Sequence, residues 1–269
     1  MISGWPMRIV HPDGMVRYGT LASRPSASTQ GPLVSCLMVS RGDRFPAEHA
    51  IRCYRQQSYT NRELVIVTTA KNSAVSALVT EIADPSIRYI EVTAPTLGEL
   101  RNASVAHARG SLIAHWDDDD LHHPERLTHQ IAALTQTGAK ACFLERILLW
   151  WPARRLLKTG HARMWEGSMI AHRAIVPVYP ARPREEDLFV ADAIARLHPV
   201  TALDWAEGYC YAVHGGNTNQ APHFAYLFGE ATAIEGALDY EAAMAQIGGF
   251  MPIGAYAAGL DISAPTRSG

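Results

Sequence analysis

Residues 112–120 read LIAHWDDDD, a mostly apolar run that ends in four consecutive acids. Apolar runs of similar length occur three more times before it, and each pair of runs is separated by a segment that fits a helix. The expected strands are 33–40, 63–69, 87–92 and 111–116, and the expected helices are 46–57, 72–83 and 97–108. Strands that are apolar on both faces and alternate with helices indicate a parallel sheet covered on both sides.

This alternation predicts an α/β fold of the doubly wound type with a mostly parallel sheet. Ligands of such sheets bind beyond the carboxyl ends of the strands. Residues 32–120 are therefore expected to form a nucleotide-binding half, with the acids of residues 117–120 at its ligand end.

Residues 121–262 are less regular and form the other half of the same predicted domain. A helix begins at Pro124, since proline suits the first helical position, and it ends at Gly138. The further elements expected here are a strand at 141–151, a loop at 158–163, a strand at 167–171, a helix at 185–197, and one or two strands in 200–213.

Residues 1–31 are interpreted as an N-terminal extension. Asp13-Gly14 between two apolar-rich segments predicts a hairpin over residues 7–21, and residues 22–32 have the composition of a linker. The extension would either cover a sheet edge or contribute to a homodimer. Residues 263–269 are expected to be a frayed tail.

Composition excludes several classes of protein. The formal net charge is −2, so a nucleic-acid polymer is not expected as a partner. The four cysteines form no CxxC pair, and Cys36 and Cys142 lie in apolar runs, which indicates buried thiols and a cytoplasmic location. There is no signal-peptide pattern and no run of about 18 apolar residues, so no transmembrane segment is expected.

The four adjacent acids at 117–120 are expected to bind a divalent cation. At an effective dielectric near 20, two like charges about 4 Å apart repel by about 4 kcal/mol. Mg²⁺ or Mn²⁺ would relieve that repulsion, because both prefer hard oxygen ligands. The alternative is a solvated acidic turn that caps the following helix.

Several stretches around the acids resemble family 2 glycosyltransferases with the GT-A fold. The matching stretches are 57–59 with 63–67, 101–102, 108–120 and 124–127. The likeness covers residues 33–130 well and 165–219 loosely. It implies a GT-A domain over 32–262, with an acceptor-binding half at 121–262. It also implies inverting transfer of a sugar from a nucleoside-diphosphate sugar to the hydroxyl of a saccharide, lipid-linked or small-molecule acceptor.

The resemblance also assigns roles within the acid cluster. Asp117 and Asp119 would form the metal-binding DxD motif, with Asp119 the more direct ligand of Mn²⁺ or Mg²⁺. Asp117 or Asp118 would reach the ribose or the same ion. Arg101 would contact the nucleotide or diphosphate, because the fixed fork of a guanidinium suits phosphate; the alternative is a solvated helix residue.

Later motifs of the family supply further candidates. Asp187, with Glu186 as second choice, would remove the proton from the acceptor hydroxyl; the alternative is acids that complement a helix dipole. His214 would contact the metal or the diphosphate, or be structural. Trp165 would pack against a sugar ring, or belong to the core.

One departure concerns the nucleobase. Family members commonly end the second strand with two acids, whereas this sequence has Thr68-Thr69. A hydroxyl can still hydrogen-bond a base but carries no charge, so UDP-, TDP- and GDP-linked donors all stay open. Ser40 and Arg41, after the first strand, are candidate base or ribose contacts.

Two other functions compete with sugar transfer. A nucleotidyltransferase would need a glycine-rich phosphate loop with a lysine, and residues 40–44 (SRGDR) are a poor version of one. A degenerate transferase that only binds a sugar nucleotide is the second, and the acids at 117, 119 and 187 argue against it.

Overall fold

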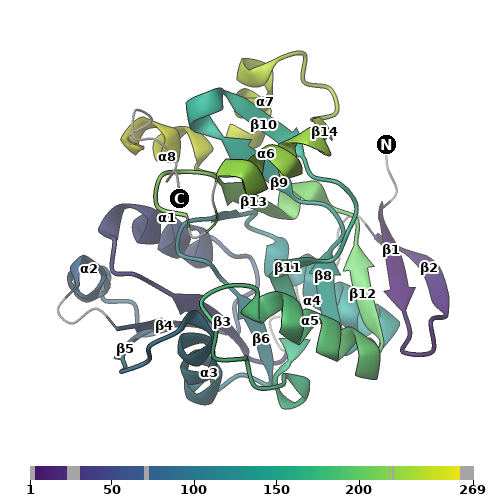
Figure 1. The fold of residues 1–269 in the computed structure, drawn as a ribbon, viewed down its shortest axis with the longest axis horizontal. Coiled ribbons are helices and arrows are strands. Elements are labelled where there is room, and N and C mark those ends of the chain that lie inside the picture. Colours follow the sequence, from purple (N-terminus) through teal and green to yellow (C-terminus); the bar gives the residue numbers. More distant parts are fainter. Residues whose placement is uncertain (1–3, 23–30, 70–72, 218, 220, 261–269) are drawn as a thin grey trace.

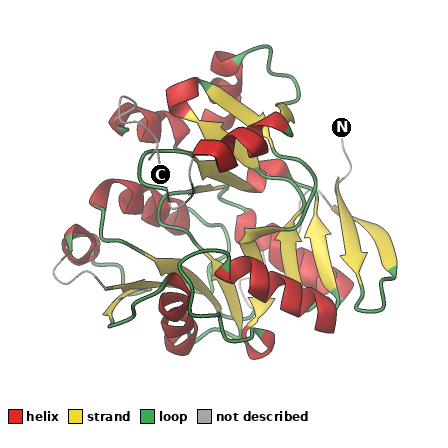
Figure 2. Ribbon diagram, viewed as in Figure 1, coloured by secondary structure: helices red, strands yellow, loops and turns green. Residues whose placement is uncertain are grey.

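The computed structural model describes residues 4–22, 31–69, 73–217, 219 and 221–260. Its strands form two sheets, one of nine strands and one of five. Helices cover both faces of the larger sheet, and the smaller sheet lies with the C-terminal helices at the top of the view in Figures 1 and 2. No helix in the described part of the chain is long and apolar enough to span a membrane.

The first half of the chain builds the parallel part of the larger sheet. Its elements are β3 (Val34–Val39), α1 (Arg44–Arg55), β4 (Arg62–Thr68), α2 (Ala74–Ile82), β5 (Ile87–Glu91), α3 (Leu97–His107) and β6 (Leu112–His115). The four strands are parallel in the order β6-β3-β4-β5. Every element lies within two residues of its predicted bounds, so the predicted fold class is confirmed.

Alternate side chains of the parallel strands face opposite layers. Cys36 and Met38 of β3 pack in one core cluster with Ile51 of α1. Leu37 and Val65 pack in a second cluster, which α3 helps to cover from the other side. This two-sided burial is why the strands read as continuous apolar runs.

The second half extends the same sheet with mixed directions. It contributes α4 (Arg126–Thr137), β8 (Ala141–Leu144), β11 (Trp165–His172), α5 (Glu186–Leu197) and β12 (Val200–Leu203). Strand β11 runs antiparallel between β6 and β8, and β12 is parallel to β8. Helix α4 ends where predicted, at Gly138 with φ 68°, but begins at Arg126 rather than Pro124 because Glu125 has a non-helical backbone.

Two predicted elements of this half were wrong in their extent, the strand 141–151 and the loop 158–163. The apolar run 141–151 is two strands, β8 and β9 (Leu148–Trp151). Residues 200–213, predicted as one or two strands, are the pair β12 and β13 (Tyr209–Ala212). In each case the first strand joins the larger sheet and the second the smaller one. Glu145 and Arg146 interrupt the first run, because their side chains pair with Arg8 and Asp204. The predicted loop 158–163 begins inside a strand, β10 (Leu156–Thr159).

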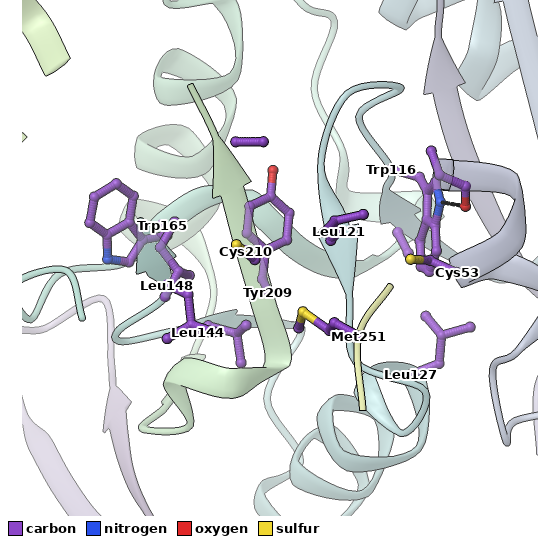
Figure 3. Packing of buried hydrophobic residues seen from close by; sticks show 14 of the residues in the cluster. Cys53, Trp116, Leu121, Leu127, Leu144, Leu148, Trp165, Tyr209, Cys210 and Met251 are labelled. Carbon is purple, nitrogen blue, oxygen red and sulfur yellow. Dashed lines mark hydrogen bonds between the residues drawn. The ribbon is translucent and has the colours of Figure 1, made fainter. Parts of the chain in front are cut away.

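The smaller sheet has the order β14-β10-β9-β13-β7, with β7 directly after the four acids. The remaining elements are β7 (Leu121–His122), β14 (Thr232–Ala233), α6 (Ala221–Gly229), α7 (Tyr240–Gly248) and α8 (Ile253–Gly259), with short 3-10 helices at Pro152–Arg154, Arg173–Ile175 and Ala206–Gly208. In the view of Figure 3, Tyr209 of β13 is drawn between Trp165 of β11 and Leu121 of β7, and all three belong to one core cluster.

The N-terminal hairpin is present as predicted, with β1 (Gly4–Val10) antiparallel to β2 (Val16–Ala22) and Gly14 in the turn at φ 85°. Strand β1 pairs with β12, so the hairpin extends the larger sheet at its edge. Most of the predicted linker and the whole predicted tail fall at 23–30 and 261–269, outside the described residues.

Candidate active site

The four acids lie in the turn between β6 and β7, at the carboxyl end of the parallel strands. The preceding residue, Trp116, is fully buried and donates its indole N–H to the Ala50 carbonyl of α1 at 3.0 Å (Figure 3). The side chains of Asp117 and Asp119 are 25% and 22% exposed, whereas Asp120 is buried. The turn therefore divides the acids between an open side and the interior.

Asp120 is the acid that faces the interior. It accepts hydrogen bonds from the Tyr209 hydroxyl and from the Ala212 N–H, the latter at 2.8 Å. Burial, reinforced by the charges of Asp119 and Asp117, raises the pKa of Asp120 well above its usual range. Asp120 thus fastens the acidic turn to strand β13.

Arg101 of α3 connects the acidic turn to helix α5. Its Nη2 donates to Oδ1 of Asp117 at 3.0 Å, and its Nε donates to Oε1 of Glu186 at 3.0 Å. The guanidinium is almost fully buried, and its Nη1 has no hydrogen-bond partner among the described residues. Burial is the largest influence on Asp117 and opposes its ionisation, but the charges of Arg101 and His115 and the hydrogen bonds from Arg101 and Tyr209 together lower the pKa of Asp117. The Arg101 guanidinium, which was expected to contact the nucleotide or diphosphate, therefore binds two carboxylates of the protein instead.

Asp118 is held by the segment that follows β3. The Ser40 hydroxyl and the Arg41 N–H donate to its carboxylate. Burial, together with the charge of Asp119, nevertheless raises the pKa of Asp118 to about 7. The Arg41 side chain reaches across and donates from Nη1 to the Gly216 carbonyl at 2.6 Å. Ser40 and Arg41 therefore lie at the acid cluster, and their predicted contact with a base or ribose stays a prediction.

Asp119 is contacted from the turn after β13 and from α8. Its Oδ2 lies 3.1 Å from Nε2 of His214 and accepts from Nδ2 of Asn217 at 3.3 Å. The Gly216 N–H donates to Nδ1 of His214 at 3.0 Å, so Nε2 carries the ring proton and donates to Asp119. The Tyr256 hydroxyl donates to the main-chain carbonyl of Asp119 at 2.9 Å.

Glu186 and Asp187 form the first turn of α5, after Glu185 in the left-handed region at φ 60°. Glu186 is buried against Arg101, and burial raises its pKa although Arg101 opposes the shift. Asp187 is half-buried, and its Oδ1 accepts from the Leu188 N–H at 2.9 Å. Of the two, Asp187 is therefore more accessible to an incoming group.

Two candidates lie inside the protein rather than on an open surface. Thr68 at the end of β4 is fully buried, and its carbonyl accepts from the Val92 N–H. Trp165 is 4% exposed, donates its indole N–H to the His161 carbonyl at 3.2 Å, and has the Arg163 guanidinium 4.2 Å from its ring. Neither side chain has the exposed surface needed to contact a base or a sugar, because each packs within the core.

The open carboxylates of Asp117 and Asp119 are the ligand type that suits Mn²⁺ or Mg²⁺. Among the described residues, no three His, Cys, Asp or Glu side chains converge to hold an ion. An ion held by one or two carboxylates together with substrate phosphates needs no such trio. The donor set therefore fits a divalent cation that binds with a phosphate-bearing ligand.

The sequence predicted a metal-binding role for the four acids together, but not the contact of Asp120 with β13, and it assigned no role to Tyr209, Asn217 or Tyr256. Tyr209 and Asn217 lie within residues 165–219, which loosely resemble the family. Tyr256 carried no signal, because nothing in its own segment relates α8 to the acids.

Comparison with known proteins places this fold in one class, the GT-A fold of glycosyltransferases. Two solved structures illustrate the likeness. The mannosyltransferase PcManGT from Pyrobaculum calidifontis, in complex with GDP-Man and Mn²⁺, has a TM-score of 0.56 at 14% identity, over 73% of this chain and 60% of that one. S. aureus TarS 1–349 in complex with UDP-GlcNAc has a TM-score of 0.52 at 14% identity, over 86% and 68%.

The sequence comparison then names the family. Residues 47–149 match the model of glycosyl transferase family 2. The putative colanic acid biosynthesis glycosyl transferase WcaA of Escherichia coli (strain K12) is 28% identical over 59% of this chain and 52% of its own length. The succinoglycan biosynthesis protein ExoO of Rhizobium meliloti (strain 1021) is 32% identical over 43% and 34%. The matched part of the chain thus spans about half, or less, of the length of these curated relatives.

Proposed function

We propose that this protein is a metal-dependent glycosyltransferase that moves a sugar from a nucleoside-diphosphate sugar to an acceptor hydroxyl with inversion of configuration. The observation that carries the proposal is the pair of ion pairs made by Arg101. They join the acidic turn after β6 to the first turn of α5, which supports a site that Asp117 and Asp187 both border.

The acidic turn is the proposed donor site. Asp119 and Asp117 would hold Mn²⁺ or Mg²⁺, and the ion would offset the charge of the leaving diphosphate. Ser40, Arg41 and Asp118 would border the nucleoside, because they lie at the carboxyl end of β3 beside the acids. PcManGT binds GDP-Man with Mn²⁺ and TarS binds UDP-GlcNAc, which supports a nucleotide-sugar donor of either kind.

We propose that His214 hydrogen-bonds the metal ligand Asp119 and is not itself a metal ligand in the resting state. Its Nε2 proton points at Asp119, and that nitrogen could bind an ion only after losing the proton or turning away. Diphosphate oxygens accept hydrogen bonds, so the same N–H can also donate to the donor substrate.

Asp187 is the proposed general base. It would take the proton of the acceptor hydroxyl while the acceptor oxygen bonds to the anomeric carbon and the bond from that carbon to the diphosphate oxygen breaks. The diphosphate leaves with the electron pair, and a single displacement of this kind inverts the anomeric centre. Glu186 is less suited, because Arg101 occupies its Oε1 and it is only 2% exposed.

Two features bear on the competing functions. The Ser40 hydroxyl accepts from the Gly42 N–H at 3.1 Å and donates to Asp118, so this loop does not present its groups as a free phosphate cradle. This disfavours a nucleotidyltransferase. The accessible Asp187 beside the acid cluster disfavours a pure binding module.

Thermal-shift assays with a panel of nucleoside diphosphates and nucleotide sugars, with and without Mn²⁺, test the donor site. Ligand binding raises the melting temperature by an amount set by ligand concentration over Kd. We expect a shift for one nucleotide that requires both Mn²⁺ and Asp119. Asp119→Ala should lose it, whereas Asp192→Ala, an exposed acid paired with Arg196 on α5, should keep it.

Turnover then separates the three functions. Release of nucleoside diphosphate from a sugar nucleotide supports a transferase, and release of pyrophosphate from a nucleoside triphosphate would support a nucleotidyltransferase. Binding without turnover would favour the binding module, and no shift at millimolar ligand would reject the proposed donor site.

The acceptor, a homodimer and the compartment stay predictions. The four cysteines are free thiols in the structure, which supports a reducing, cytoplasmic compartment.

A further inference from the structure

Helix α8 reaches the acidic turn although it lies far from it in sequence. Tyr256 on this helix is fully buried, and its hydroxyl donates to the carbonyl of Asp119, 137 residues away, at 2.9 Å. Helix α8 lies outside residues 47–149, the segment that matches the family. The contact is therefore a feature of this chain's C-terminal part.

Packing fixes the position of the Tyr256 ring. The ring stacks on Phe45 with centroids 5.3 Å apart, and it also contacts His49 of α1 at 4.9 Å and Trp150 of β9 at 5.7 Å. Gly259, at the end of α8, lies so close to Phe45 that an added Cβ would be 2.2 Å from its ring. Helix α8 is thus seated tightly on α1, and the hydroxyl has little freedom to leave Asp119.

Asp119 is consequently held at both its main chain and its side chain. Tyr256 holds the carbonyl, while His214 and Asn217 hold Oδ2. The peptide plane that follows Asp119 also sets the direction of Asp120, which is fastened to β13. A change in that plane would move the open carboxylate relative to its neighbours.

We propose that Tyr256 is a positioning residue for Asp119, and that α8 is thereby a working part of the metal and donor site. The inference rests on the metal dependence of the proposed function. Groups that orient a metal ligand without touching the ion commonly change metal affinity by about 10- to 100-fold when they are removed.

The test is Mn²⁺ binding to the full chain, measured by the electron paramagnetic resonance signal of free Mn²⁺ during titration. Tyr256→Phe removes only the hydroxyl and should weaken Mn²⁺ binding by about tenfold. The matched control is Tyr59→Phe, because Tyr59 is also buried and also donates to a backbone carbonyl, that of Pro32 at 2.7 Å. Both variants should lose similar thermal stability, but the control should bind Mn²⁺ like the wild type.

The outcomes are distinguishable. Equal Mn²⁺ affinity of Tyr256→Phe and wild type would overturn the positioning role and leave the proposed function standing. A wild type that binds no Mn²⁺, either alone or with a nucleoside diphosphate present, would overturn both. Equal weakening in both variants would mean general destabilisation and would also reject the role. If Tyr256→Phe does not fold, Phe45→Leu loosens the ring while keeping the hydroxyl, and unchanged affinity there would refute the inference.

Discussion

Arg101→Met removes the cation between Asp117 and Glu186 while keeping most of the side-chain volume. Both ion pairs have N···O distances of 3.0 Å. At an effective dielectric near 20, each pair is attractive by about 5 to 6 kcal/mol, and the cost of removing these groups from water offsets much of it. Without Arg101, two carboxylates stay in a region where burial already raises the pKa of Glu186.

We expect Arg101→Met to lower the free energy of unfolding by about 3–5 kcal/mol, the usual cost of breaking a buried ion pair from one side. The difference in unfolding free energy between wild type and Arg101→Met should shrink as the pH falls. Without the cation, burial holds the pKa of Asp117 and of Glu186 above its value in the unfolded chain. At low pH the protonated acids therefore cost the variant little, whereas at higher pH their ionised forms destabilise it.

Urea unfolding at equilibrium, followed at several pH values, measures this effect. Arg196→Met is the matched control, because Arg196 pairs with Asp192 on the exposed face of α5. An exposed pair of this kind contributes less than about 1 kcal/mol. Adding Glu186→Gln to Arg101→Met should recover part of the loss. A loss for Arg101→Met no larger than that of the control would refute the reasoning.

Three further changes probe other parts of the molecule. Glu63 accepts from the Ser35 hydroxyl at 2.6 Å and from the Arg109 N–H at 2.7 Å, and it pairs with Arg88 at 3.2 Å. Burial opposes its ionisation, but these three contacts together lower its pKa. Glu63→Gln should therefore cost about 1–2 kcal/mol at neutral pH, a difference that disappears as acid protonates the wild-type carboxylate; equal costs at pH 3 and pH 7, measured by urea unfolding, would contradict this. Asp187→Asn should lower kcat roughly 100- to 10,000-fold and keep the donor-induced thermal shift, and full turnover would move the base role elsewhere. Trp165→Ala should cost about 3–5 kcal/mol of stability in the same unfolding assay, whereas a change confined to acceptor KM would restore the sugar-packing role.

The Arg101 contacts have a consequence for how the site works. One cation joins Asp117 of the acidic turn to Glu186 of the helix that carries the proposed base, through two ion pairs of 3.0 Å each. Arg101 would thus act as a positioning residue rather than as the phosphate contact that the family resemblance implied.

Secondary structure in the first half followed from the sequence because it depends on local pattern. Strands buried on both faces must be continuously apolar, and the helices between them bury one stripe each, as Ile51 does in α1. The prediction for the second half was wrong where two strands follow one another without a helix between them. Residues 141–151 have the composition of one strand, and the pairing of Glu145 and Arg146 with distant partners marks where the chain passes from one sheet to the other.

The candidate site was also predicted only in part. The position of the acids 117–120 at the ligand end of the sheet could be predicted, because they come directly after a strand of the parallel sheet. The burial of Thr68 and Trp165 could not, because a side chain's exposure depends on what packs over it.

By itself, therefore, the sequence determined a parallel α/β half with an acid cluster at its ligand edge. The tertiary structure alone decided which groups meet those acids. Arg101 lies 16 residues from Asp117 and 85 from Glu186, and Tyr256 lies 137 residues from Asp119. Such contacts are set by how separate helices and strands pack together, and no local pattern of residues encodes which of them become neighbours.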